Sequence, residues 1–330
     1  MFNGSYDNLP GAKCVCSAYV LVATSRGNGR WSGAPIVATA LLAVAFSLAS
    51  CSAHGPPADL PDGGYTDTDC AETLDGSDEP IFDQSNSGFT LTGDETYLEF
   101  NGAIYDGPAV AFHHESDRIG TCRLLTYESS SCDPDCPGGD VCIDEECVSY
   151  PATISAGALT LTGVADAPVE LEPWSGQYSW SSSTSILDVA AVRAQAAGDA
   201  TDPFDLTTCA VEPPAPEGDW SAAMSARGAG EDVTLTWSNP YSTSRVYLRM
   251  TTGIGTHGGI SPVEIECEGR DLGSLTLPGA FLDQLYDGPY WSCGECGDNR
   301  LLRYHATGTE VGGTTVQLRT QSPAMFYFRP

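Results

Sequence analysis

Basic residues are scarce in this chain. Only 14 of its 330 residues are Lys or Arg, against 44 Asp and Glu, so the formal net charge at pH 7 is -30. A protein that binds nucleic acid needs a patch of Lys and Arg to neutralise phosphates. The charge balance therefore excludes nucleic acid as a partner and disfavours other anionic polymers.

The chain also lacks an apolar run of membrane-spanning length. Its longest run, residues 36–48, holds 13 residues, whereas a transmembrane helix needs about 20. Arg26 and Arg30 precede this run, and the small residues Ala49 and Ser50 follow it. This order is typical of a signal peptide, so we predict that residues 1–50 direct export and are then removed. A short transmembrane helix is the alternative.

The predicted signal ends in Leu48-Ala49-Ser50-Cys51, which resembles the lipobox of bacterial lipoproteins. The resemblance implies cleavage before Cys51, a diacylglycerol on its thiol and an acyl chain such as palmitate on its amino group. Because Ser52 rather than Asp follows, it also implies the outer membrane, with a periplasmic or cell-surface orientation. The alternative is cleavage near Ser50 that leaves a free thiol.

Residues 1–25 fit a signal peptide poorly. They place an acidic and aromatic stretch with two cysteines ahead of Arg26 and Arg30. No other Met precedes Cys51, so we expect translation to begin at a non-Met codon such as that of Val20, Leu21 or Val22.

Ten of the 13 cysteines remain after the signal is removed and Cys51 is acylated. An even number in an exported chain favours disulfide bonds, although the sequence does not reveal their pairing. The candidates are Cys70, Cys122, Cys132, Cys136, Cys142, Cys147, Cys209, Cys267, Cys293 and Cys296.

Four of these cysteines, Cys132, Cys136, Cys142 and Cys147, lie within a segment that has almost nothing apolar to bury. We predict a disulfide knot there, because such a segment needs covalent links to hold one conformation. The spacings also suit zinc, but an exporting cell would oxidise these thiols first.

Turn-forming residues are abundant, with 36 Gly and 22 Pro, and they separate many short alternating runs. Runs at such spacing predict an all-β fold of β-sandwich type, with one or two antiparallel sandwiches and an inserted disulfide-rich segment. One short helix is expected at 278–285. The expected strands are 89–93, 97–100, 109–112, 121–125, 157–163, 168–171, 177–180, 188–194, 204–206, 232–237, 245–250, 263–267, 274–277, 301–304 and 315–318.

Composition divides the chain further. Residues 51–80 are polar, acidic and rich in Pro and Gly, which predicts a flexible tether. Calcium binding by the tether is an alternative, although the EF-hand register is absent. The predicted segments beyond it are first strands at 81–127, the disulfide knot at 128–150, strands completing a first lobe at 151–212, a Pro-rich linker at 213–219 and a C-terminal sandwich lobe at 220–330.

Several motifs resemble a group of uncharacterised Cys-rich lipoproteins from myxobacteria. They are Gly120-Thr-Cys-Arg-Leu-Leu125, Ser155-Ala-Gly-Ala-Leu-Thr-Leu-Thr-Gly163, Pro168-Val-Glu-Leu171, Asp232-Val-Thr-Leu-Thr-Trp237, Ile265-Glu-Cys267 and Gly273-Ser-Leu-Thr-Leu-Pro278. The resemblance covers about two thirds of the chain. It implies an all-β exported lipoprotein and assigns no activity or site.

The densest cluster of potential catalytic or metal-binding groups is His113, His114, Glu115 and Asp117. Neighbouring residues of a strand point to opposite faces, so we interpret the cluster as a polar strand end rather than a metal or acid/base site. His257 and His305 are the other histidines beyond the tether. No nucleophile elbow or zinc-binding His-Glu-x-x-His motif accompanies any of them.

A cysteine pair and an aromatic cluster near the C-terminal end each allow two interpretations. Cys293 and Cys296 have redox spacing but lie among Gly and Asp, so a structural disulfide is favoured. Tyr286, Tyr290 and Trp291 form a candidate binding patch for a sugar ring or a protein, with loop packing as the alternative.

These observations predict a membrane-anchored exported lipoprotein with a non-enzymatic binding or structural role at the cell envelope. The expected partners are the membrane, through the lipid, and a protein or neutral glycan. No cofactor is expected, calcium being the alternative. The competing functions are an envelope hydrolase with an unrecognised His/carboxylate site and a calcium-dependent adhesin.

Overall fold

The computed structural model describes residues 79–82, 87–127, 132–138, 140–251, 261–286 and 299–326. Within these ranges the fold is all-β apart from short helices, as the sequence predicts. The strands are β1 Gly88–Gly93, β2 Leu98–Tyr105, β3 His114–Ile119, β4 Cys122–Thr126, β5 Val141–Ile143, β6 Glu146–Val148, β7 Thr153–Ile154, β8 Leu159–Thr162, β9 Val169–Leu171, β10 Gln177–Ser182, β11 Ala191–Ala196, β12 Phe204–Cys209, β13 Val233–Thr236, β14 Arg245–Thr251, β15 Val263–Arg270, β16 Ser274–Leu277, β17 Arg300–Val311 and β18 Thr314–Met325. The helices are η3 Ile186–Asp188, α1 Trp220–Ala226 and α2 Gly279–Tyr286.

One large sheet organises the fold. Its strand order is β10-β2-β1-β18-β17-β14-β15-β4-β3, with β7 also paired to β2. β1 and β18 pair in parallel, and the neighbours β17 and β18 form a long antiparallel hairpin. The hairpin turns through Gly312 and Gly313, whose φ angles of 58° and 86° suit the two-residue turns that join right-twisted strands.

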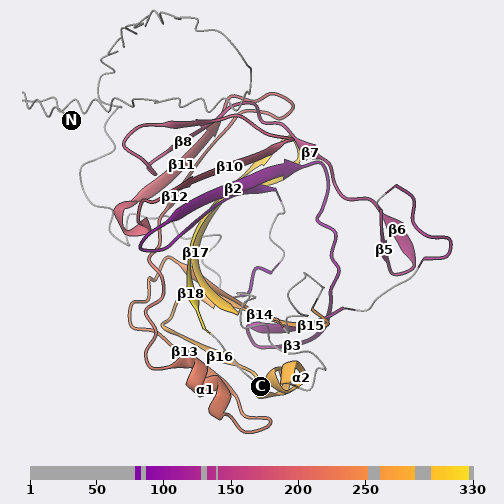
Figure 1. Ribbon diagram of the computed structural model, residues 1–330, viewed down its shortest axis with the longest axis vertical. Helices are drawn as coiled ribbons and strands as arrows, with labels where there is room; N and C mark the ends of the chain where they lie inside the picture. Colours follow the sequence, from indigo (N-terminus) through magenta and orange to yellow (C-terminus); the bar gives the residue numbers. More distant parts are fainter. Residues whose placement is uncertain are drawn as a thin grey trace, which may run out of the picture. The chain divides into compact units, whose positions relative to one another are not determined.

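A four-stranded sheet, β12-β11-β8-β9, covers one half of the large sheet (Figure 1). Side chains of both sheets meet in a first core. Phe89 of β1 lies at its centre, with its ring 5.7 Å from Phe100, 5.6 Å from Tyr178 and 5.8 Å from Phe204. This half is a sheet-on-sheet sandwich, and it is built from alternating strand residues.

A smaller layer covers the other half. The two-stranded sheet β13-β16 packs with α1 and α2 over β4, β14 and β15, forming a second core (Figure 1). Asp219 caps α1 by accepting a hydrogen bond from the Ala222 amide at 3.0 Å. The carboxylate of Asp232 accepts one from the Gly279 amide at 2.7 Å, where α2 begins.

Buried polar groups separate the two cores. Thr320 and Ser322 of β18 donate hydrogen bonds to the carbonyls of Cys209 and Val211, which fixes the chain between the two covering layers. Next to them, Arg303 of β17 donates from Nε to Asp271 at 2.7 Å and from Nη1 to the Glu212 carbonyl at 3.0 Å. Burial lowers the pKa of Arg303, and the charge of Asp271 opposes this change.

Several sequence expectations need correction. Residues 109–112 alternate in burial but form no strand, and the strand begins instead at His114. Helix α1 and the β5–β6 hairpin inside the Cys-rich segment were not expected. The sheet order also crosses the expected boundary between two lobes, because β3 and β4 pair beside β15 whereas β1 and β2 lie at the other end.

Candidate binding site

The predicted cluster His113, His114, Glu115 and Asp117 does not converge on one point. The Nε2–H of His113 donates to the Ser261 carbonyl at 2.7 Å, and this nitrogen lies 3.5 Å from Glu264. His114 instead lies 3.4 Å from Asp144. A register irregularity between Glu115 and Asp117 changes the direction of the strand's side chains.

Arginine side chains occupy the acidic half of the same cluster. Arg118 donates two hydrogen bonds to Glu115, at 2.7 and 2.6 Å, and its own amide donates to Asp117 at 2.8 Å. The bond from Arg118 lowers the pKa of Glu115. A carboxylate held ionised in this way is a poor proton donor at neutral pH. We expected a polar strand end after 109–112, but Glu115 and Asp117 lie within β3 instead, and the side chains of the cluster engage separate partners.

The remaining histidines lie apart from this cluster. His305 is buried, with Nε2 3.4 Å from the Thr243 hydroxyl, and it points to the sheet face that carries the two cores. His113 reaches Glu264 on the opposite face. His257 lies outside the described residues.

The opposite face of the sheet carries a row of ion pairs, which we call the charged face. Three glutamates alternate along β15, and each pairs with an arginine of a neighbouring strand. The pairs are Arg249–Glu264 at 2.6 Å, Arg123–Glu266 at 2.7 Å and Arg245–Glu268 at 2.9 Å. All three glutamates are buried, so each pair gives a buried carboxylate a cationic partner, although the Arg249 side chain itself is 36% exposed.

Tyrosines complete the charged face. The hydroxyl of Tyr247 donates to Glu266, and that of Tyr304 donates to Glu268. Burial, reinforced by the neighbouring carboxylates, raises the pKa of both tyrosines far above the usual value. Both hydroxyls therefore stay protonated at neutral pH and act as fixed donors.

The end of the expected tether packs on this face. The guanidinium of Arg245 donates to the Glu79 carbonyl at 2.6 Å, and Glu268 accepts from the Ile81 amide. The Phe82 ring lies 4.3 Å from the guanidinium carbon of Arg123. Residues 79 and 80 therefore belong to the folded body, and the predicted tether boundary at 80 was too late.

Seven predicted disulfide cysteines lie within the described residues, and all seven are oxidised. The bonds are Cys122–Cys267, Cys132–Cys142 and Cys136–Cys147. Cys209 is also disulfide-bonded. Cys51, Cys70, Cys293 and Cys296 lie outside them as well.

The Cys-rich segment forms the expected disulfide knot. The sulfur atoms of Cys132, Cys136 and Cys147 lie within 4.8 Å of one another, which resembles a metal-ligand cluster in spacing alone. Metal binding by cysteine needs thiolates, and these sulfurs are in disulfides.

A groove of about 700 Å³, which the sequence did not indicate, lies beside β16. The β3–β4 turn at 119–121, the end of β15 at Gly269 and Arg270, and β16 itself line it. Two exposed apolar residues, Ile119 at 44% and Leu272 at 72%, are among its lining residues. No single residue type signals such a groove, because it forms from backbone segments distant in sequence.

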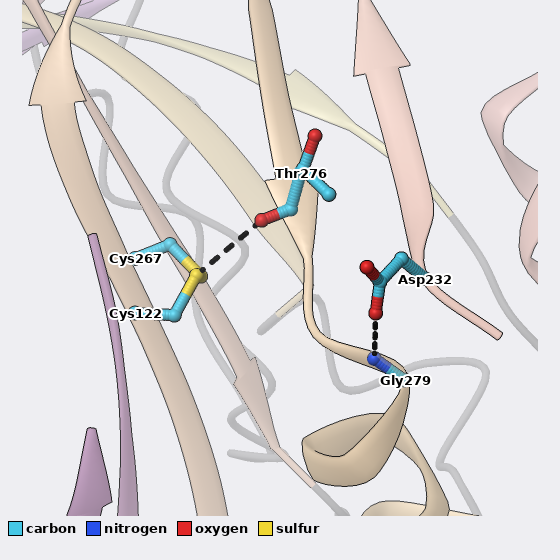
Figure 2. The surroundings of a disulfide bond; sticks show 5 residues. All are labelled: Cys122, Asp232, Cys267, Thr276 and Gly279. Atoms are coloured by element: carbon cyan, nitrogen blue, oxygen red, sulfur yellow. Dashed lines mark hydrogen bonds between the residues drawn. A yellow bond between two sulfur atoms is a disulfide. The ribbon is translucent and has the colours of Figure 1, made fainter. Parts of the chain in front are cut away.

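The disulfide Cys122–Cys267 lies against β16 (Figure 2). The two cysteines face each other directly across β4 and β15. The Sγ atom of Cys122 lies 3.6 Å from the Thr276 carbonyl oxygen. This is a packing contact and not a hydrogen bond, because a disulfide sulfur carries no hydrogen. The bond therefore fixes the two sheet strands directly beneath the β16 edge.

The predicted aromatic patch is described only at its first residue. Tyr286 is the last residue of α2, whereas Tyr290 and Trp291 lie outside the described residues. No helix in the described ranges is long and apolar enough to cross a membrane. Comparison with protein families and with curated proteins gives no match.

Proposed function

We propose that this protein is an exported lipoprotein, anchored through acylated Cys51, that binds a partner at the cell envelope and does not act as an enzyme. The lipobox supports the anchor, and the oxidised cysteines agree with an exported chain. The proposed location is the outer membrane.

The observation that carries the binding role is the groove beside β16. Its lining consists of turn backbone, small side chains and aliphatic side chains, with Asp232 and Arg270 as charged groups. Such a lining offers hydrogen bonds and apolar contact but no paired acid and base for proton transfer. Among the described residues, His113, His114 and His305 engage separate partners, which also supports binding over catalysis.

The anchor is tested by intact mass and detergent partitioning. We expect a chain that begins at acylated Cys51 and partitions into detergent, and Cys51→Ala should make it water-soluble. A water-soluble product that starts at another residue would contradict the anchor.

The binding role is tested by crosslinking and capture from intact envelopes, alongside a broad hydrolase screen. The variants are His113→Ala, His114→Ala, His257→Ala and His305→Ala, tested singly. We expect partner capture in every case and no turnover. Turnover that one of these changes abolishes would show that the protein is an enzyme.

A further inference from the structure

Arginines are concentrated on the charged face, although basic residues are scarce in the chain. Strands β14, β17 and β18 are neighbours in the large sheet (Figure 1). Arg249 of β14 lies directly opposite Arg300 of β17, and Ala306 of β17 lies directly opposite Arg319 of β18. Alternate residues of a strand point to one face, so Arg300 and Ala306 share the face of Tyr304. The arginines of the charged face are Arg123, Arg245, Arg249, Arg300 and Arg319.

The glutamates of this face are already engaged by other arginines. Each of the three glutamates of β15 pairs with one arginine of the row described above. Glu264, the nearest of them along β14, accepts hydrogen bonds from Arg249 on both oxygens, at 2.9 and 2.6 Å. Arg300 and Arg319 therefore add positive charge beside a row in which every glutamate has its own arginine.

Arg300 occupies an unfavourable position in the sheet. Like charges directly opposite each other on neighbouring strands are destabilising, and the residue opposite Arg300 is Arg249. The Nε–H of Arg300 is also buried without a hydrogen-bond partner in the part of the chain that the structure describes. A buried donor that lacks an acceptor costs free energy. Folded proteins keep such groups mainly where a ligand or a function needs them.

The guanidinium of Arg319 lies within the electric field of Arg300. Burial lowers the pKa of Arg319, and the charge of Arg300 lowers it further, whereas Tyr304, Tyr247 and Glu268 oppose the change. The guanidinium carbon of Arg319 lies 3.8 Å from the centre of the Tyr304 ring. A guanidinium that stacks on a ring donates hydrogen bonds in its own plane, in the fork geometry that binds oxyanions.

Solvent reaches both arginines. Arg300 and Arg319 are each partly exposed. Met325, directly opposite Arg300 on β18, is 44% exposed, so the β17–β18 end of the charged face is open beside Arg300. A small ion can therefore approach the two guanidiniums from this end.

The charges of the site indicate the charge and size of its ligand. Two guanidiniums beyond the paired row suit an ion with two negative charges and several acceptor oxygens. The net charge of -30 repels anions, but charges in solution act over only about 8 Å at physiological salt. A small anion therefore responds mainly to the nearby arginines, whereas an anionic polymer would also meet the acidic surface around them.

We propose that Arg300 and Arg319 bind a small tetrahedral dianion of the phosphate or sulfate type, with Arg249 at the border of the site. The proposed site shares no residue with the groove beside β16. It goes beyond the proposed partner binding and does not depend on it.

Isothermal titration calorimetry on the full chain in detergent tests the site. The probes are inorganic phosphate, sulfate and glycerol 3-phosphate, with acetate as a monoanion, all at one ionic strength set with chloride. We expect saturable binding of the dianions and at least about tenfold weaker binding of acetate, because it offers one charge and two oxygens. Tighter binding of glycerol 3-phosphate than of inorganic phosphate would identify the phosphate group of a larger molecule as the ligand.

The variants are Arg300→Met, Arg300→Lys and Arg193→Met. Removing the guanidinium in Arg300→Met should weaken phosphate binding at least about tenfold. Arg300→Lys keeps the charge but loses the planar fork, so it should weaken binding at least about threefold. Arg193, in an exposed ion pair on the four-stranded sheet, is the matched control, and its replacement should leave binding within about twofold.

Thermal unfolding separates a ligand-binding arginine from a structural one. Without phosphate, Arg300→Met should melt at a higher temperature than wild type, because it removes the like charge opposite Arg249. Saturating phosphate should raise the melting temperature of wild type but not of Arg300→Met. An arginine with a purely structural role would instead lower the melting temperature when replaced, with or without phosphate.

Three results would overturn the inference. They are no binding of any dianion to wild type, acetate binding as tight as that of phosphate, and unchanged phosphate binding by folded Arg300→Met. If Arg300→Met does not fold, unchanged binding by Arg300→Lys has the same meaning. Capture of the envelope partner by Arg300→Met should equal that of wild type, so the anion site and the proposed binding function can fail separately.

Discussion

The two halves of the large sheet are stabilised in different ways. The first half lies under a four-stranded sheet, and rings around Phe89 fill the space between the two layers. The second half lies under two strands and two short helices. That half also has a disulfide within the sheet and a row of ion pairs on the charged face.

The difference indicates how a smaller cover is compensated. A two-stranded sheet is only marginally stable by itself, so β13-β16 depends on what lies beneath it. Covalent and ionic links hold β4, β14 and β15 in register and so give that cover a fixed surface. Beside this narrow cover, β16 borders a groove.

The largest expected effect is in the first half. Phe89→Ala should lower the free energy of unfolding by about 3–5 kcal/mol, because it leaves a cavity among three other rings. Urea unfolding at neutral pH measures the loss. The control is Trp174→Ala, whose side chain is 82% exposed and should change stability little. A loss for Phe89→Ala as small as that of the control would contradict this account of the first core.

Removing the Cys122–Cys267 disulfide tests how the second half of the large sheet is stabilised. Replacing Cys122 and Cys267 together by Ala should lower the free energy of unfolding by about 2–4 kcal/mol. Amide hydrogen exchange should quicken in β4, β15 and β16 more than in β1 and β11. The comparison variant replaces Cys132 and Cys142, whose bond closes a short segment, and should affect only the Cys-rich segment. Equal quickening in both halves would show that the halves are not independent.

The charged face should contribute less than either core. Glu266→Gln removes the charge that Arg123 and Tyr247 share, and hydrogen bonds to a charged group contribute about 1.5–3 kcal/mol. Urea unfolding measures the change, with the exposed Glu310→Gln as control. If the two substitutions have equal effects, the buried row does not stabilise the second half.

The smallest effect on stability is expected from the Arg193–Asp205 ion pair, which lies on the four-stranded sheet that covers the first half. Hydrogen bonds from Arg193 lower the pKa of Asp205 from its ordinary value of 3.8. The pair is about half exposed, so Asp205→Asn should cost less than about 1 kcal/mol at pH 7. Because the folded-state pKa is the lower one, this contribution is present above the ordinary pKa and disappears as pH falls through the folded-state value. Unfolding at pH 7 and again at strongly acid pH should show a difference that vanishes in acid.

The sequence predicted most strands because their alternation matches burial, as Leu275 and Leu277 show in β16. It did not predict β3, whose residues are all exposed and give no alternating signal. Residues 109–112 carried that signal without a partner strand, since alternation reports burial and not pairing. The groove was beyond sequence reasoning, because Gly120, Gly269 and Thr276 meet only through the order of strands.

The parallel pairing of β1 with β18 has a kinetic consequence. These are the first and last strands of the described residues. Nearly all of the chain between them must therefore leave the ribosome before the two strands can pair. Contacts of such long separation form slowly, because a large loop must close first. Until then, one edge of β1 stays open and exposed to pairing with other chains. A chain of this topology should therefore complete its sheet only after β18 has been synthesised, and chaperones that shield strand edges should raise its yield.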